Sequence, residues 1–216
     1  MAEEQGRLGR RFYELGLRLG QLGTVAIGSA GGPLALALAR IAGGAAALAG
    51  GEVRFHDGGC AACAAWLGRY YALPASLFLR QSGGALAFWV LDGRGRLFDP
   101  PDRSPIPPRR AGEWDVLVGA DQAWAAARSA DSGGSAVLSA QGPVGLILAL
   151  ERMGCSLVAP RPGVPLLRSD REGFSLTLEV NGRTSSLPGE DALAAAASWL
   201  GRRERRPAAS PAPRLV

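Results

Sequence analysis

The residues best suited to chemistry in this 216-residue chain lie between positions 56 and 63. Cys60 and Cys63 form a C-x-x-C motif, a spacing found in thiol redox sites and in zinc sites. A structural zinc ion needs about four ligands, and the rest of the chain offers only Cys155 and the single histidine, His56. Both cysteines stand among alanines at the expected start of a helix. We therefore favour small-residue packing, while a thiol activated by the helix N-terminus stays open as the alternative.

Two neighbouring segments contain residue types found in catalytic or anion-binding sites. Asp57 follows His56, and an aspartate can orient a histidine that acts as a base, but the sequence suggests no nucleophile for the pair. Residues 28–32, Gly-Ser-Ala-Gly-Gly, precede Pro33, so their N–H groups could hold a phosphate at a helix start. They lack the Walker A lysine and the complete dinucleotide fingerprint. We expect a structural histidine and a tight strand-to-helix turn.

Alternating helices and strands must position these residues. Apolar side chains recur at helical spacing from Leu8 to Leu19, and the dipeptide Asn181-Gly182 between two strand-like runs predicts a hairpin. Helices are expected over residues 6–22, 33–48, 61–71, 142–153 and 190–200, and within 114–128 after a short strand. Strands are expected over residues 25–27, 53–55, 75–79, 87–91, 136–138, 156–158, 174–180 and 183–187. This order predicts an α/β fold made of two consecutive three-layer α/β/α units with mostly parallel or mixed sheets.

Composition divides the chain into two units and a tail. The sequence Asp131-Ser132-Gly133-Gly134 predicts a boundary between a first unit, residues 1–130, and a smaller second unit, residues 131–201. Residues 202–216, rich in arginine and proline, are expected to be a disordered tail, and they supply +4 of the net charge of +5. Since the remainder is nearly neutral, a nucleic-acid partner is not expected.

The compartment can also be predicted from composition. Three cysteines cannot form a closed disulfide framework, which favours a reducing, cytoplasmic location. Residues 19–39 carry no charge, but six of them are glycine or proline and Arg40 follows, so a membrane segment is not expected.

The order of these features resembles the α-D-phosphohexomutase superfamily, which includes phosphoglucomutases and phosphomannomutases. The first unit follows the family's first domain from Phe12 to Leu97, and the second follows its next domain from Ala136 to Leu200. The family's serine loop, T-A-S-H-N-P, falls on Gln81-Ser82-Gly83-Gly84, and its metal-binding D-x-D-G-D-R falls on Asp170-Arg171-Glu172-Gly173. The resemblance implies the family's fold, with Ser82 in place of the phosphoserine.

The departures from the family's pattern imply that its chemistry is lost. In the family, the phosphoserine transfers its phosphoryl group beside a Mg²⁺ ion held by three aspartates. Here Ser82 stands without the histidine, asparagine or proline, and Phe174 occupies the place of the third aspartate. Asp170 and Glu172 alone are a poor match to the near-octahedral oxygen ligation of Mg²⁺. The regions that hold the sugar later in the family's chain have no counterpart in this sequence.

We therefore expect a degenerate, catalytically inactive phosphohexomutase-like protein that needs no cofactor. Its role would be binding, either of a phosphosugar or another anion at Ser82, Gly83 and Gly84, or of a protein partner, including a second copy of the chain. The enzyme alternative is a residual mutase or phosphoryl-transfer activity that uses Ser82 with Mg²⁺ at the vestigial ligands Asp170 and Glu172. The third alternative is a redox or metal-binding protein that works through Cys60 and Cys63.

Overall fold

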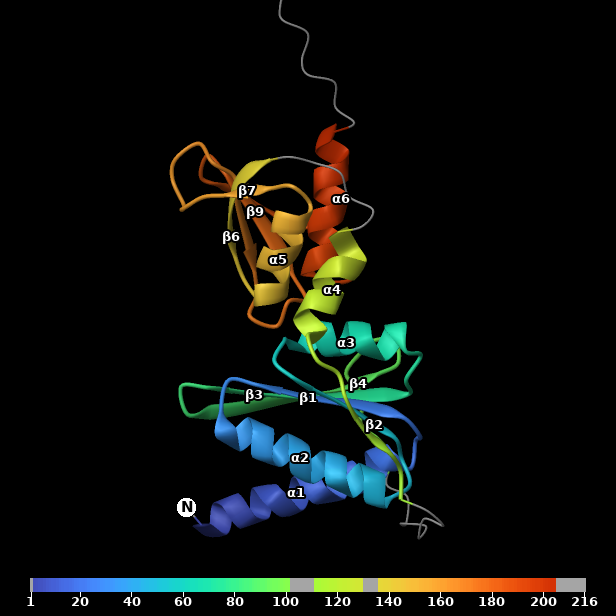
Figure 1. Ribbon diagram of the computed structural model, residues 1–216. Helices are drawn as coiled ribbons and strands as arrows, with labels where there is room; N and C mark the ends of the chain where they lie inside the picture. The colour runs from blue at the N-terminus through green and yellow to red at the C-terminus, as the bar shows by residue number, and fades with distance from the viewer. Residues whose placement is uncertain (1, 102–110, 130–135, 205–216) are drawn as a thin grey trace, which may run out of the picture. The chain divides into compact units, whose positions relative to one another are not determined.

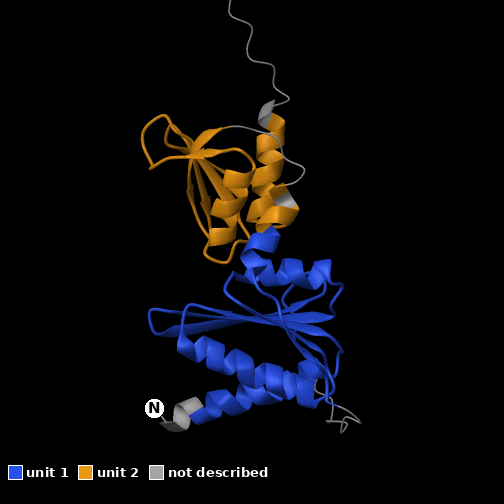
Figure 2. Ribbon diagram, in the orientation of Figure 1, with its two compact units in different colours: residues 1–124 blue, residues 125–216 orange. Residues whose placement is uncertain are grey.

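The computed structural model describes residues 2–101, 111–129 and 136–204, and the chain divides into two compact units (Figure 2). Unit 1 is Met1–Trp124 and unit 2 is Ala125–Val216. The boundary predicted at residue 131 falls outside the described residues, as does most of the predicted tail. The α/β class with mixed sheets is confirmed in both units.

Unit 1 is a five-stranded mixed sheet covered by helices on both faces (Figure 1). Its elements are α1 (Ala2–Gly20), β1 (Val25–Ala30), α2 (Pro33–Leu48), β2 (Val53–Asp57), α3 (Ala61–Tyr70), β3 (Ala75–Ser82), β4 (Ala85–Asp92) and β5 (Trp114–Val116). The strand order is β4-β3-β1-β2-β5, in which only β4 is antiparallel to its neighbour. A further helix, α4 (Ala120–Ser129), crosses the boundary between the units.

Two helices, α1 and α2, pack side by side on one face of this sheet, and α3 lies on the other (Figure 1). The helical spacing seen in the sequence is confirmed, because Phe12, Leu15 and Leu19 are buried in the core. A Cβ atom on Gly16 would overlap the carbonyl oxygen of Ala42 on α2. The helices therefore approach so closely that only glycine fits there.

The uncharged stretch from residue 19 to 39 forms β1 and the start of α2 in the core of unit 1. The side chains of Val25, Ala26 and Ile27 are fully buried, as expected for a central strand paired on both sides. None of the described helices is long and apolar enough to cross a membrane.

Unit 2 contains a second five-stranded mixed sheet. Its elements are β6 (Val137–Gln141), α5 (Val144–Arg152), β7 (Ser156–Leu157), β8 (Leu166–Ser169), β9 (Leu176–Val180), β10 (Arg183–Leu187) and α6 (Ala192–Glu204). The strand order is β10-β9-β8-β6-β7. The hairpin predicted at Asn181-Gly182 is confirmed, since both residues have the positive φ, 50° and 75°, that a tight primed turn requires.

The two units repeat one chain path. In each, an interior strand, β1 or β6, leads through a helix to a parallel neighbour, and the next strand pairs with the other side of that interior strand before a hairpin. The second connection is α3 in unit 1 and a loop, residues 158–165, in unit 2. The repeat agrees with the duplication that two similar units in the sequence suggest.

Candidate functional site

The carboxyl ends of β1, β2 and β3 meet at one edge of the unit 1 sheet, where α2 and α3 begin. In open α/β sheets, ligands bind at this edge, beside the point where successive connections leave toward opposite faces. Here β1 leads to α2 and its neighbour β2 leads to α3, which cover opposite faces (Figure 1). The three segments that the sequence analysis singled out in this unit, residues 28–32, 56–63 and 81–84, all lie at this edge.

Ser82 is the last residue of β3 and pairs with Ala85, the first residue of β4. Gly83 and Gly84 between them have φ values of 57° and 83°, so the segment that the sequence compares with the family's serine loop is a two-residue hairpin turn. The Ser82 side chain is exposed, and its hydroxyl forms no hydrogen bond within the described part of the chain. No described side chain forms the hydrogen bond to this hydroxyl through which a base would activate it.

The glycine-rich turn between β1 and α2 is closed by contacts from β3. The backbone N–H of Leu34, in the first turn of α2, donates to the side-chain oxygen of Gln81 at 3.1 Å. A Cβ atom on Gly31 or on Gly32 would overlap Gln81. A side chain of the protein thus occupies the helix start where a phosphate would bind, which supports the interpretation as a structural turn.

His56 is fully buried beneath this edge. Its ring stacks on the Phe78 ring, with 6.0 Å between the ring centres. The His56 ring also lies so close to Gly28 that a Cβ atom on this glycine would overlap it. Burial lowers the pKa of His56 from 6.5 to about 4, and its Nδ1 lies 3.3 Å from the carbonyl oxygen of Gly58. Asp57 is exposed and accepts a hydrogen bond from Ser29 at 3.3 Å. The histidine is therefore neutral near pH 7 and packs as part of the core.

Both cysteines of the C-x-x-C motif are buried at the start of α3, Cys60 as the residue before the helix and Cys63 in its first turn. None of the three cysteines of the chain is joined in a disulfide bond. Among the described residues, no group of three histidine, cysteine, aspartate or glutamate side chains could hold a metal ion. The burial of both cysteines agrees with the packing interpretation.

Asp121, which the sequence did not single out, lies at the same edge. It belongs to the first turn of α4, and a Cβ on Gly59 would contact both its carboxylate and the Cys63 sulfur at 3.4 Å. Burial raises the pKa of Asp121, and a hydrogen bond from the Gly59 N–H opposes that rise. An acidic residue in a first helical turn was the available signal, but it is too common in proteins to mark a site.

In unit 2, the Asp170 carboxylate is engaged by hydrogen bonds from residues of its own turn. Its carboxylate accepts hydrogen bonds from the backbone N–H groups of Glu172, Phe174 and Ser175 at 3.0–3.1 Å, and from the Ser175 hydroxyl at 2.6 Å. These four donors use the lone pairs that a Mg²⁺ ion would need. Asp170 and Glu172 belong to unit 2, whereas Ser82 belongs to unit 1.

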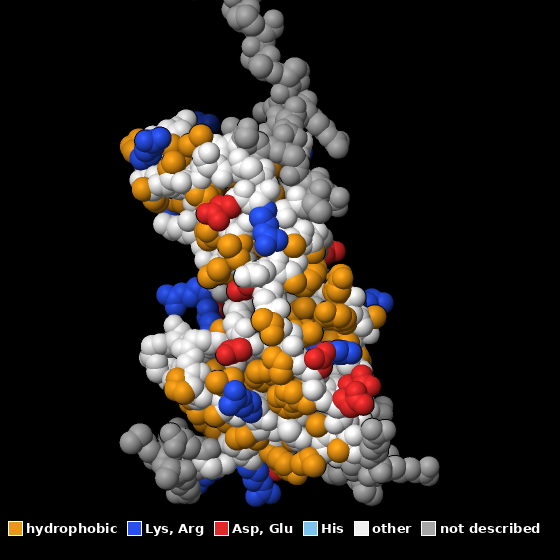
Figure 3. All heavy atoms as spheres, viewed as in Figure 1, with side chains coloured by type: hydrophobic (Ala, Val, Ile, Leu, Met, Phe, Trp, Pro, Cys, Tyr) orange, Lys and Arg blue, Asp and Glu red, His pale blue; other side chains and the backbone are white. Residues whose placement is uncertain are grey.

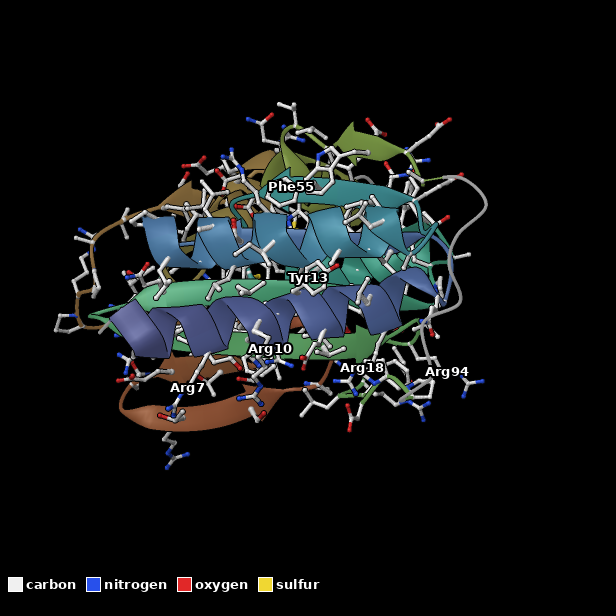
Figure 4. All side chains as sticks on the ribbon, turned by 90° about the horizontal axis from the view of Figure 1, so that it is seen from below. Arg7, Arg10, Tyr13, Arg18, Phe55 and Arg94 are labelled. Atoms are coloured by element: carbon white, nitrogen blue, oxygen red, sulfur yellow. The ribbon has the colours of Figure 1, made fainter. Side chains whose placement is uncertain are left out.

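A groove of about 530 Å³ lies elsewhere in unit 1, between α1 and the edge strand β4. Its apolar walls include Phe12, Leu15 and Val90, and its mouth carries Arg11 and Arg18. Figure 4 shows that Arg18 lies on the side of α1 away from α2, whereas Tyr13 lies toward α2. The volume falls within the range of about 300–1,000 Å³ typical of ligand sites.

No protein-family model matches the sequence, and no curated protein matches it. Solved structures do resemble it. A phosphoglucomutase/phosphomannomutase family protein from Burkholderia thailandensis matches 83% of this chain and 52% of its own, with a TM-score of 0.58 and 10% identity. A candidate phosphomannomutase from Thermus thermophilus matches 79% of this chain and 53% of its own, with a TM-score of 0.52 and 17% identity. The chain thus spans about half the length of these structures, and over that half it has the phosphoglucomutase/phosphomannomutase fold.

Proposed function

We propose that this chain is a phosphohexomutase-like protein without mutase activity and that it works by binding. The observation that carries the proposal is the state of Asp170, whose carboxylate is engaged by four donors of its own turn. Phosphoryl transfer depends on a metal ion that neutralises the developing charge, and the Asp170 carboxylate has no lone pair to spare for one.

The position of Ser82 supports the same proposal. Phosphoryl transfer needs a nucleophile held in line with the phosphorus, close to groups that stabilise charge. Ser82 ends a strand at a minimal turn, and its hydroxyl has no hydrogen-bond partner in the described residues. The adjoining helix start is filled by Gln81, and Asp57 is exposed at the same edge. Arg80 brings one positive charge to this edge and Asp57 brings one negative charge. An anionic sugar phosphate would meet no net positive charge from this pair, so we favour a protein partner over a phosphosugar.

The surface of unit 1 supports a protein partner. Apolar side chains appear at its surface (Figure 3), and large exposed ones include Tyr13 and Ile41 at 42% and 39% exposure. Exposed aromatic and aliphatic groups are the usual anchors of protein interfaces. The buried cysteines form no disulfide bond, which supports the cytoplasmic location that we propose.

The test is an assay of phosphoglucomutase and phosphomannomutase turnover with Mg²⁺ and a sugar bisphosphate activator. We expect no turnover, and no change in the melting temperature when Mg²⁺ is added. Circular dichroism checks that the sample is folded, and Ser82→Ala is the matched variant. Turnover that disappears in Ser82→Ala would overturn the proposal and place phosphoryl transfer at that serine.

A further inference from the structure

The edge strand β4 is covered along only part of its length. On its outer side, Asp92 N–H donates to the carbonyl oxygen of Arg96 at 2.8 Å, and Phe98 N–H donates to the carbonyl oxygen of Val90 at 3.0 Å. Asp99 follows, and after it Pro100 and Pro101 have no N–H group and cannot continue a ladder. The half of β4 nearest the hairpin turn is therefore left without an outer neighbour among the described residues.

Strand geometry identifies which backbone groups of β4 have no hydrogen-bond partner among the described residues on the uncovered side. The backbone groups of successive residues in a strand point alternately to its two edges, and those of Val90 and Asp92 point away from β3. The N–H and C=O groups of Leu86 and Phe88, which lie an even number of residues away, therefore point outward as well. Neither residue forms a backbone bond on that side within the described part of the chain. Unpaired edge groups of this kind are a template for an added strand.

Phe88, at the open part of β4, and Val90, at the part paired with residues 96–98, line the groove between α1 and β4. Leu86, Phe88 and Val90 face α1, where Phe88 packs edge-on against Phe12 at 5.2 Å. Phe88 is 37% exposed and Leu97 is 77% exposed, which is unusual for large apolar side chains at a groove. A strand added to the open edge would place every second side chain into this apolar space.

The charge at the mouth of the groove is positive. The Arg11 guanidinium lies 5.4 Å from the centre of the Phe88 ring and has no carboxylate partner in the described residues. Arg10, by contrast, pairs with Glu14, and Arg18 pairs with Asp99. Figure 4 shows Arg7 and Arg18 on the side of α1 away from α2. An acidic group on the partner would meet Arg11 at the rim.

We propose that the open edge of β4 binds an extended peptide by strand addition. On the face toward α1, this peptide carries an apolar residue and a carboxylate two positions apart. Backbone hydrogen bonds to Leu86 and Phe88 supply general affinity, and the groove with Arg11 supplies selectivity. A second copy of this chain fits less well, because edge-to-edge pairing with the helices on one face would bring two arginine-bearing α1 helices together.

This inference rests on the binding role proposed above and gives that role a partner class. The two fail in different experiments. Mutase turnover would overturn the binding role whether or not a peptide binds. A peptide that does not bind would overturn the inference alone and would not restore mutase activity to the chain.

The probe is a fluorescein-labelled peptide, Ser-Leu-Thr-Glu-Thr-Leu-Ser, in which leucines and glutamate share one face of a strand. Binding to the full chain is measured by fluorescence anisotropy. Two further peptides are N-methylated on every second backbone amide. One carries the methyl groups on the set of odd-numbered amides and the other carries them on the set of even-numbered amides. Strand addition predicts that one set weakens binding about tenfold or more while the other changes it less than about twofold. Equal effects of both sets would overturn the proposal.

Protein variants place the peptide on β4. Arg11→Glu is expected to weaken binding about five- to tenfold, and the same substitution at exposed Arg152 in unit 2 is expected to leave it unchanged. In NMR amide-exchange experiments on the unaltered protein, the Leu86 and Phe88 amides should gain protection when the peptide is added. Unchanged exchange at both amides, equal binding of a peptide with lysine in place of glutamate, or dimers detected by light scattering without peptide would refute the proposal.

Discussion

The burial of His56 makes stability depend on pH in a window that can be stated in advance. The pKa of His56 is 6.5 in an unfolded chain and about 4 in the folded protein, because burial disfavours the charged ring. Below pH 6.5 the unfolded chain binds a proton that the folded chain does not accept until the pH approaches 4. The free energy of unfolding therefore falls as the pH falls through this window, and it levels off below it.

The size of this loss follows from the difference between the two pKa values. At about 1.36 kcal/mol per pKa unit, the interval from 6.5 to about 4 corresponds to about 3 kcal/mol of stability. That is a large part of the ~5–15 kcal/mol that holds a typical domain folded. We expect the loss to dominate the acid limb of the stability curve of unit 1.

The assay compares urea unfolding of the wild type and of His56→Gln between pH 4 and pH 7.5. The lowered pKa of Asp92, which accepts hydrogen bonds from Arg96, and the raised pKa of Asp121 affect both proteins alike. Their contributions cancel in the difference between the two curves, which should fall by about 3 kcal/mol as the pH falls. A difference curve that stays flat would refute the reasoning.

A direct titration covers the case in which the variant does not fold. The chain has one histidine, so its imidazole signal in an NMR titration needs no assignment. The ring should stay neutral down to about pH 5 in the folded protein, in line with its lowered pKa. An imidazole that titrates near pH 6.5 while the backbone spectrum remains that of the folded state would show that the ring is solvated and that the pH argument is wrong.

Three further expectations follow from the packing. Gly16→Ala should destabilise the protein by about 1–3 kcal/mol in urea unfolding because its Cβ would overlap α2, whereas Gly44→Ala, with open space around its Cβ, should be neutral or stabilising. Asp170→Ala should cost about 1–3 kcal/mol in the same assay through the loss of its turn, with no effect of Mg²⁺ in either protein. Cys60 and Cys63 should react with a thiol reagent only after unfolding, and fast labelling of the native protein would contradict their burial.

The sequence predicted most of the fold because its periodic segments agree with their tertiary surroundings. The helical spacing in α1, the buried run of β1 and the turn at Asn181-Gly182 each carry a local signal that the packing reinforces. The short strand Leu166–Ser169 was missed. Its few residues contain too little alternation to be recognised, and this strand exists because β6 and β9 pair with it on either side.

The candidate site was less predictable because it depends on contacts distant in sequence. The role of Gln81 as the cap of α2 joins residues 47 positions apart, and no local pattern announces it. The structural use of Asp170 was also hidden, since an aspartate in a turn and an aspartate in a metal site look alike in one sequence. Within the described residues, the pairing on the outer side of β4 ends before Pro100, and this effect of the proline is visible only once the pairing of residues 96–98 with β4 is known.

The chain path repeated in the two units has a consequence for vectorial synthesis. In each unit the first strand to leave the ribosome, β1 or β6, is an interior strand, and both of its neighbours follow it in the sequence. At about 5–20 residues per second, the apolar β1 waits roughly 3–10 s for β3 to emerge. A nascent chain therefore carries an unpaired interior strand twice, once per unit, and holdase chaperones have two separate intervals in which to engage it.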